Sequence, residues 1–168
     1  MTDSKFEELV KKHAAEQRDS ASEIAARQER QQLWWQERIA ELLDRIERWL
    51  APLIAAKAIE FSRTSVRLVE EPLGTYEAQS GVIRLGVDKL TIEPVGSVVI
   101  GAFGRVDLVS RKGTVMLLLS TLDPLIPEEQ RQANAEWVVS YPIARKQLIP
   151  LTRDAFERVF TALFAIGE

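Results

Sequence analysis

Residues 90–119, LTIEPVGSVVIGAFGRVDLVSRKGTVMLLL, decide the fold, because apolar and polar residues alternate there between turn-forming ones. Val106 and Leu108 alternate with charged residues, which is the period-two pattern of a strand with one buried face. Residues 110–113 follow as a hairpin loop that ends in glycine. Residues 114–119 are nearly all apolar and predict the most buried strand. The stretch therefore indicates a run of short antiparallel strands.

Similar segments occur on both sides of this stretch. Segments with the same alternation, or with a short buried run, are residues 61–70, 83–87, 98–100 and 137–141. Gly101 and Gly104 predict a sharp bend that lets the sheet curl, and Pro142 is expected to end the last strand. Together these patterns predict an antiparallel sheet of about five to seven strands.

The last part of the chain predicts an amphipathic helix packed on this sheet. Thr152 is a good N-cap, and Leu151 with Phe156 has the spacing of a hydrophobic staple. Gly167 is expected to close the helix. One face is densely apolar, formed by Phe156, Val159, Phe160, Leu163 and Phe164.

The first fifty residues predict one long helix. No glycine or proline precedes Pro52, and residues 4–50 would span about 70 Å as an unbroken helix. Pro52 predicts a kink, with residues 53–59 continuing as a short helical piece. From residue 35 onward the apolar positions form a helical stripe that must bury against something. Across residues 11–32 the stripe is thin, so this part frays, projects, or pairs with a second chain as a coiled coil.

The element order predicts an α+β fold. We divide the chain into a long helical arm, residues 1–60, and an antiparallel β domain with a C-terminal helix, residues 61–168. Strands followed by a helix, in this order, resemble a pleckstrin-homology-like roll, in which a curled sheet is plugged by the last helix. An open antiparallel sheet with helices on one face is equally compatible.

The composition removes several classes of function. The chain has no cysteine, which excludes disulfides, thiolate metal sites and cysteine nucleophiles. Its one histidine, His13, lies among charged residues on a polar helix face, where we expect it to be solvated. The net charge of -3 argues against non-specific phosphate binding, so nucleic acid is an unlikely partner. We predict no cofactor, no metal and no catalytic residue.

The chain also lacks the patterns that direct proteins to membranes. The first residues have no basic start followed by an apolar run, and the longest uncharged runs are too short to span a bilayer. We therefore expect a cytoplasmic protein without a membrane partner. The loop after residue 70 is acidic, which disfavours lipid headgroups as ligands.

Two groups of residues are candidates for a functional surface. The first is the helical stripe, in which tryptophans suggest an interaction surface; it contains Trp34, Trp35, Ile39, Leu42, Ile46 and Trp49. The second would line a small-molecule site in the mouth of a curled sheet; it contains Arg105, Asp107, Trp137 and Tyr141. For Arg105 and Asp107, a salt bridge on the wet face of the sheet is the simpler reading.

The sequence therefore predicts a non-enzymatic protein that associates through its long N-terminal helix. The partner is either a second copy of the chain, which gives a dimer, or a different protein. In the second case this chain binds its target as an adaptor, a chaperone or an immunity-type inhibitor does. A small-molecule-binding β-roll is the alternative, and an enzyme or a nucleic-acid binder is less favoured.

Overall fold

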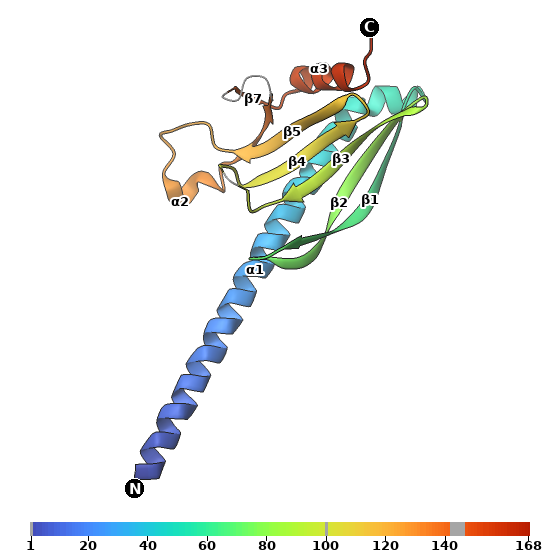
Figure 1. Ribbon diagram of the computed structural model, residues 1–168. Coiled ribbons are helices and arrows are strands. Elements are labelled where there is room, and N and C mark those ends of the chain that lie inside the picture. Colours follow the sequence, from blue (N-terminus) through green and yellow to red (C-terminus); the bar gives the residue numbers. More distant parts are fainter. Residues whose placement is uncertain (1, 100, 142–146) are drawn as a thin grey trace.

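The computed structural model describes residues 2–99, 101–141 and 147–168. It confirms the α+β class: a long N-terminal helix, an antiparallel sheet of seven strands that is not closed, and a C-terminal helix (Figure 1). In chain order the elements are α1 (Thr2–Ala55), β1 (Glu60–Glu70), β2 (Gly74–Leu85), β3 (Asp88–Gly96), β4 (Gly104–Ser110), β5 (Gly113–Ser120), α2 (Glu128–Arg131), β6 (Glu136–Ser140), β7 (Leu148–Pro150) and α3 (Arg153–Leu163).

The sheet is a meander in which each strand pairs with its neighbours in the sequence. All of these pairings are antiparallel, and the longest hairpin runs from the pair Glu60–Arg84 to the pair Glu70–Gly74. Because the strand order is β1 to β7 without a β1–β7 pairing, the sheet stays open. Of the two architectures that the sequence allows, the structure has the open sheet with helices on one face.

α1 continues through Pro52 and ends three residues later. Residues 53–59 were expected to form a further helical piece, but Ala56 to Ala58 form a turn, and β1 begins at Glu60. Lys57 has a φ of 58°, and the amide groups of Lys57 and Ala58 donate to carbonyl groups in the last turn of α1. This is a Schellman-type helix end with lysine in the left-handed position that glycine usually occupies.

One face of the sheet forms the core with α1 and α3. The sheet contributes fully buried side chains that alternate along β2 to β5, and α3 contributes its aromatic face. Trp49 of α1 packs against Phe156 of α3 with ring centroids 5.5 Å apart. The core from α1 consists of Trp35, Ile39, Leu42, Leu43, Ile46 and Leu50.

β5 differs from its prediction as the most buried strand. Leu117 and Leu119 face the core and are buried, whereas Met116 and Leu118 are only half-buried. The helices lie on the Leu117 side of the sheet, so the apolar residues of the opposite side are less covered.

The strands near the ends of the sheet were harder to predict. β2 begins at Gly74 rather than residue 83, and the tight turn after it is Gly86–Val87. β7 was not predicted, because its three residues are exposed and give no alternation. The expected buried strand 98–100 is wrong in its described part, because Val98 is exposed and Val99 forms only an isolated bridge with Ala102. Ile100 and the expected strand end at Pro142 lie outside the described residues.

α3 begins as expected and ends differently. The Thr152 side chain accepts a hydrogen bond from the Ala155 amide, as an N-cap does. The helix ends at Leu163, and Ala165 (φ 53°) rather than Gly167 occupies the left-handed position that closes it. The amide groups of Ala165 and Ile166 donate to the last helical carbonyls. Both long helices of this chain thus end on a non-glycine residue in a left-handed conformation.

Candidate interaction surface

The predicted interaction residues of α1 divide into buried and half-buried positions. Trp35, Ile39, Leu42 and Ile46 are at most 1% exposed and belong to the core of the same chain. Trp34 and Trp49 are half-buried against that core. The stripe that the sequence singles out is therefore covered by the protein's own sheet over most of its length.

Trp35 marks the point where α1 begins to be buried. Its indole ring lies 6.0 Å from the ring of Trp137 and directly against Gly104 at the start of β4. A Cβ atom at residue 104 would overlap the indole ring, so this close approach requires glycine. Trp35 thereby fixes the helix to β4, which lies in the middle of the meander, and to β6, which lies near its far side.

A group of glutamines before and just after Trp35 joins α1 to the rest of the protein. We call Gln28, Gln31, Gln32 and Gln36 the glutamine collar. Gln28 donates to the Pro72 carbonyl at 2.8 Å, and Gln36 donates to the Glu77 carbonyl at 2.6 Å. Gln32 likewise donates to the Leu73 carbonyl, and Gln31 accepts from Gln132 at 3.0 Å. The collar therefore ties the helix to the β1–β2 turn, to β2 at Glu77 and to Gln132 at the end of α2.

Glu70 organises the polar contacts next to this collar. Its carboxylate accepts hydrogen bonds from the Tyr76 hydroxyl and from the amide groups of Ser97 and Val98, the latter two at 2.9 Å. Burial raises the pKa of the Tyr76 phenol above its usual value, as do the hydrogen bond and charge of Glu70, while Trp35 acts in the opposite direction. The carboxylate thus fastens the β3–β4 loop to the β1–β2 hairpin beneath the helix.

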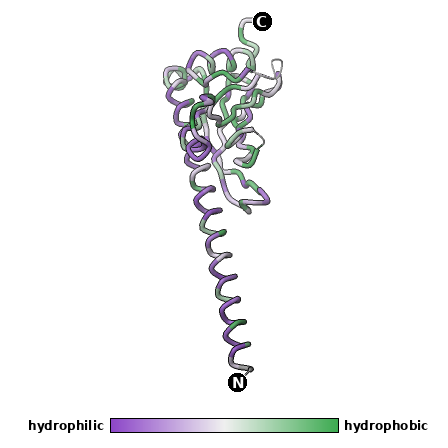
Figure 2. The backbone as a smooth tube through the Cα atoms, turned by 90° about the vertical axis from the view of Figure 1, so that its left-hand side faces the viewer, coloured by the Kyte–Doolittle hydropathy of each residue, from purple (hydrophilic) through white to green (hydrophobic). Residues whose placement is uncertain are grey.

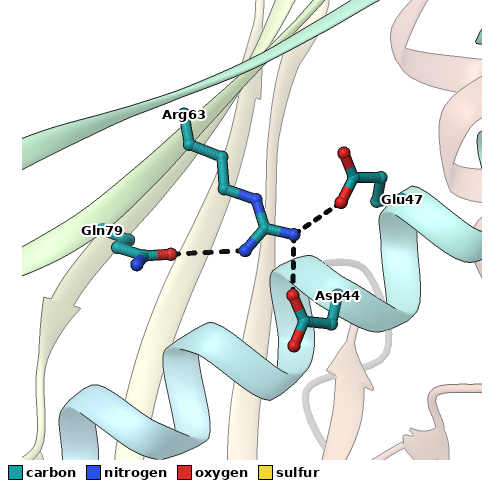
Figure 3. Close-up of polar contacts among 4 residues, drawn as sticks. All are labelled: Asp44, Glu47, Arg63 and Gln79. Atoms are coloured by element: carbon teal, nitrogen blue, oxygen red, sulfur yellow. Dashed lines mark hydrogen bonds and ion pairs between the residues drawn. The ribbon is translucent and has the colours of Figure 1, made fainter.

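An arginine on β1 links the sheet edge to α1 (Figure 3). Arg63 Nη2 lies 2.8 Å from Asp44 Oδ1 and 2.7 Å from Glu47 Oε2, and the other terminal nitrogen lies 3.3 Å from Gln79 Oε1. Burial would lower the pKa of the guanidinium, but the hydrogen bonds and charges of Asp44 and Glu47 raise it overall. The contact directs a charge inward from an edge strand, which protects the edge against pairing with another chain.

Among the residues that the structure describes, those of α1 before Gln28 make no such contacts with the sheet. We call residues 2–27 the arm; every residue from 4 to 27 is exposed. Figures 1 and 2 show this part as a single straight helix that stands clear of the sheet. At 1.5 Å per residue its exposed part is about 36 Å long. Among the residues that the structure describes, one ion pair lies within the arm, between Glu23 and Arg27 at 4.0 Å.

Large apolar side chains are exposed along the arm. Phe6 is 67% exposed, Val10 50% and Ile24 54%, and Leu9 is also exposed. A helix that is solvated on all sides gains nothing from such residues, because burial of apolar surface is the main contribution that packing makes to helix stability. The sequence indicated a thin apolar stripe over residues 11–32; Ile24 lies within that range, whereas Phe6, Leu9 and Val10 precede it.

The predicted small-molecule residues are separated by the sheet. Arg105 and Asp107 project from one face and pair with each other at 2.8 and 2.9 Å, which raises the pKa of Arg105 through the Asp107 hydrogen bond. Trp137 pairs with Leu119 on the opposite face, in the core, and Tyr141 packs against the same core. The structure therefore does not bring the four residues together around one cavity.

Two further observations concern the residues that the structure describes. None of their helices combines the length and the apolar character that a bilayer crossing requires. Within the described ranges, no three histidine, cysteine, aspartate or glutamate side chains gather closely enough to hold a metal ion.

The sequence matches no protein family, no curated protein and no solved structure.

Proposed function

We propose that this protein is a non-enzymatic interaction protein that binds another protein chain through the arm. The observation that carries the proposal is a helix of which residues 4–27 are exposed on every side while Phe6, Val10 and Ile24 remain on its surface. Helices in soluble proteins are mostly stabilised by packing, so an ordered helix with exposed apolar residues is typical of a segment with a partner.

The contacts at the base of the arm support this proposal. The glutamine collar, Trp35 and the Arg63 contact hold the second half of α1 at three successive places. A helix fixed in this way projects its free half in one direction. A pre-organised binding segment loses less conformational entropy on association than a disordered one, which favours affinity.

The test compares the full chain with a variant that lacks the arm, residues 2–27, and retains the collar. Thermal unfolding first establishes that the shortened chain keeps the folded core. Light scattering then measures molar mass, and each chain, immobilised, is used to capture proteins from a lysate of the source cells. We expect arm-dependent association: either the full chain alone forms an oligomer, or it captures a defined protein that the shortened chain does not.

The same comparison contains the outcome that overturns the proposal. If the full and shortened chains have the same oligomeric state, and neither captures a protein that the other does not, the arm is not an association device. A control variant with Ile24→Ala and Val10→Ala keeps the arm's length and helical propensity. It is expected to lose association as deletion does, because it removes apolar surface alone.

A further inference from the structure

The apolar face of the arm continues the face of α1 that the sheet covers. Ala14, Ala21, Gln28 and Trp35 are seven residues apart and share one side of the helix, with a drift of about 20° per heptad. Trp35 is buried beneath the sheet, Gln28 contacts the β1–β2 turn, and the two alanines are exposed. A partner of the arm therefore lies in line with the sheet rather than on the opposite side.

This face is a narrow stripe without charged residues. Val10, Ala14, Gln17, Ala21 and Ile24 follow the alternating four–three spacing of the two core positions of a coiled coil. Between residues 10 and 31 no acid or base occupies a core position of this register. The stripe has the width that one partner helix covers.

The positions that flank the stripe carry positive charge only. On one side they are Ser4, Lys11, Arg18 and Ala25, and on the other side Phe6, His13, Ser20 and Arg27. The acids between residues 8 and 29 all lie on the outer face of the helix; they are Glu8, Glu16, Asp19, Glu23 and Glu29. Flanking charges select the partner of a coiled coil, and these cations are complementary to acidic residues.

A second copy of this chain fits the stripe poorly. In a parallel pair, the second helix would run along the same face into the β1–β2 turn and the sheet, because both halves of α1 use that face. In an antiparallel pair that overlaps the two arms, Lys11 of one copy faces Arg18 of the other, twice. Like charges at flanking positions disfavour pairing.

We propose that the arm binds an amphipathic helix of a different protein, with acidic residues flanking the apolar positions. This inference rests on the proposed function and specifies its partner. The partner helix covers Val10, Ala14, Ala21 and Ile24, and its carboxylates pair with Lys11, Arg18 and Arg27. The same cations keep copies of this chain apart, so the native protein is a monomer when it is alone.

The test uses a charge-swapped copy of the chain as the acidic probe. The probe carries Lys11→Glu and Arg18→Glu, so its antiparallel overlap with the native arm brings two glutamates against two cations. The matched control probe carries Lys5→Glu and Lys12→Glu, which change the net charge equally on the outer face of the helix. Because the chain has no cysteine, Ala14→Cys in the native partner and Gln17→Cys in each probe report pairing as a disulfide.

In a redox buffer of low ionic strength, we expect on the order of tenfold more heterodisulfide with the acidic probe than with the control probe. At high salt we expect the two heterodisulfide yields to become equal, because the charges are screened. Light scattering of the native chain alone is expected to give the mass of a monomer. Equal yields with the two probes overturn the acidic partner. An arm-dependent dimer of the native chain also overturns the acidic partner, but it leaves the proposed function intact. The proposed function fails only if deletion of the arm changes no association.

Discussion

The two halves of α1 have one backbone geometry and opposite surroundings. In the second half Trp35, Leu42 and Ile46 are fully buried, whereas in the arm Phe6 and Ile24 are more than half exposed. The helix hydrogen bonds are formed in both halves, so secondary structure alone does not separate them. What separates them is the sheet, which covers one half and leaves the same face of the other half open. One continuous helix thus contains a buried segment and an exposed segment, and the boundary between them lies at the glutamine collar.

The largest expected effect is the difference in unfolding free energy between two isoleucine-to-alanine variants, one in each half of α1. Ile46→Ala leaves a cavity in the core, and we expect the free energy of unfolding to fall by about 3 kcal/mol. Ile24→Ala in the arm removes exposed atoms, and we expect a change within about 0.5 kcal/mol. Urea unfolding followed by tryptophan fluorescence measures both. A comparable loss in the two variants would show that the arm is packed in the free protein.

A smaller effect concerns the base of the arm at alkaline pH. The pKa of Tyr76 in the folded protein lies above its ordinary value of 10.0, first because of burial and then because of Glu70. The neutral phenol therefore contributes stability that is fully present below about pH 10 and is lost as the pH rises further. We expect the unfolding free energy to fall more steeply above this pH in the native protein than in Tyr76→Phe. Urea unfolding at increasing pH tests this, and parallel curves would contradict it.

The smallest expected effect on stability concerns Lys57, at the C-terminal end of α1. Lys57 closes the helix in a left-handed conformation that costs little for glycine. Lys57→Gly is expected to raise the free energy of unfolding by about 0.5–1 kcal/mol. Lys57→Ala is the control, because it removes the charge and keeps the backbone strain. If glycine and alanine have equal effects, the lysine conformation carries no measurable strain.

Much of the fold follows from local patterns in the sequence. The absence of glycine and proline before Pro52 predicts the length of α1, and alternation predicts β1, β4 and β6 to within a residue or two. Thr152 predicts the start of α3. These features depend on neighbours in the sequence, which is why periodicity and capping are enough to find them.

The features that were missed depend on contacts between distant segments. The buried residues of β2 near its start are Tyr76, Ala78 and Ser80, whose small or polar side chains give no apolar alternation. Glu70 looks like part of an acidic loop, and its role depends on amide groups that lie 27 and 28 residues further along the chain. The division of α1 into two segments also depends on where the sheet ends in space. The apolar stripe, thin over residues 11–32 and full from residue 35 onward, predicted that burial begins near Trp35, but not the contacts that Gln28 and Gln32 make with the β1–β2 turn.

The meander order of the sheet has a consequence for how the chain folds. Each strand finds its partner among its immediate sequence neighbours, so the sheet grows by local hairpin formation, which is fast. The contacts of α1 are different: Gln31 and Gln132, for example, are separated by 101 residues. During synthesis the apolar side of α1 leaves the ribosome before any of the sheet; its contacts with β1 and the β1–β2 hairpin, 16 to 44 residues apart, can form early, whereas the contact with Gln132 waits until most of the sheet has followed. The nascent chain therefore passes through a stage in which its longest helix is exposed along its entire length, and the sheet closes over only one half of it.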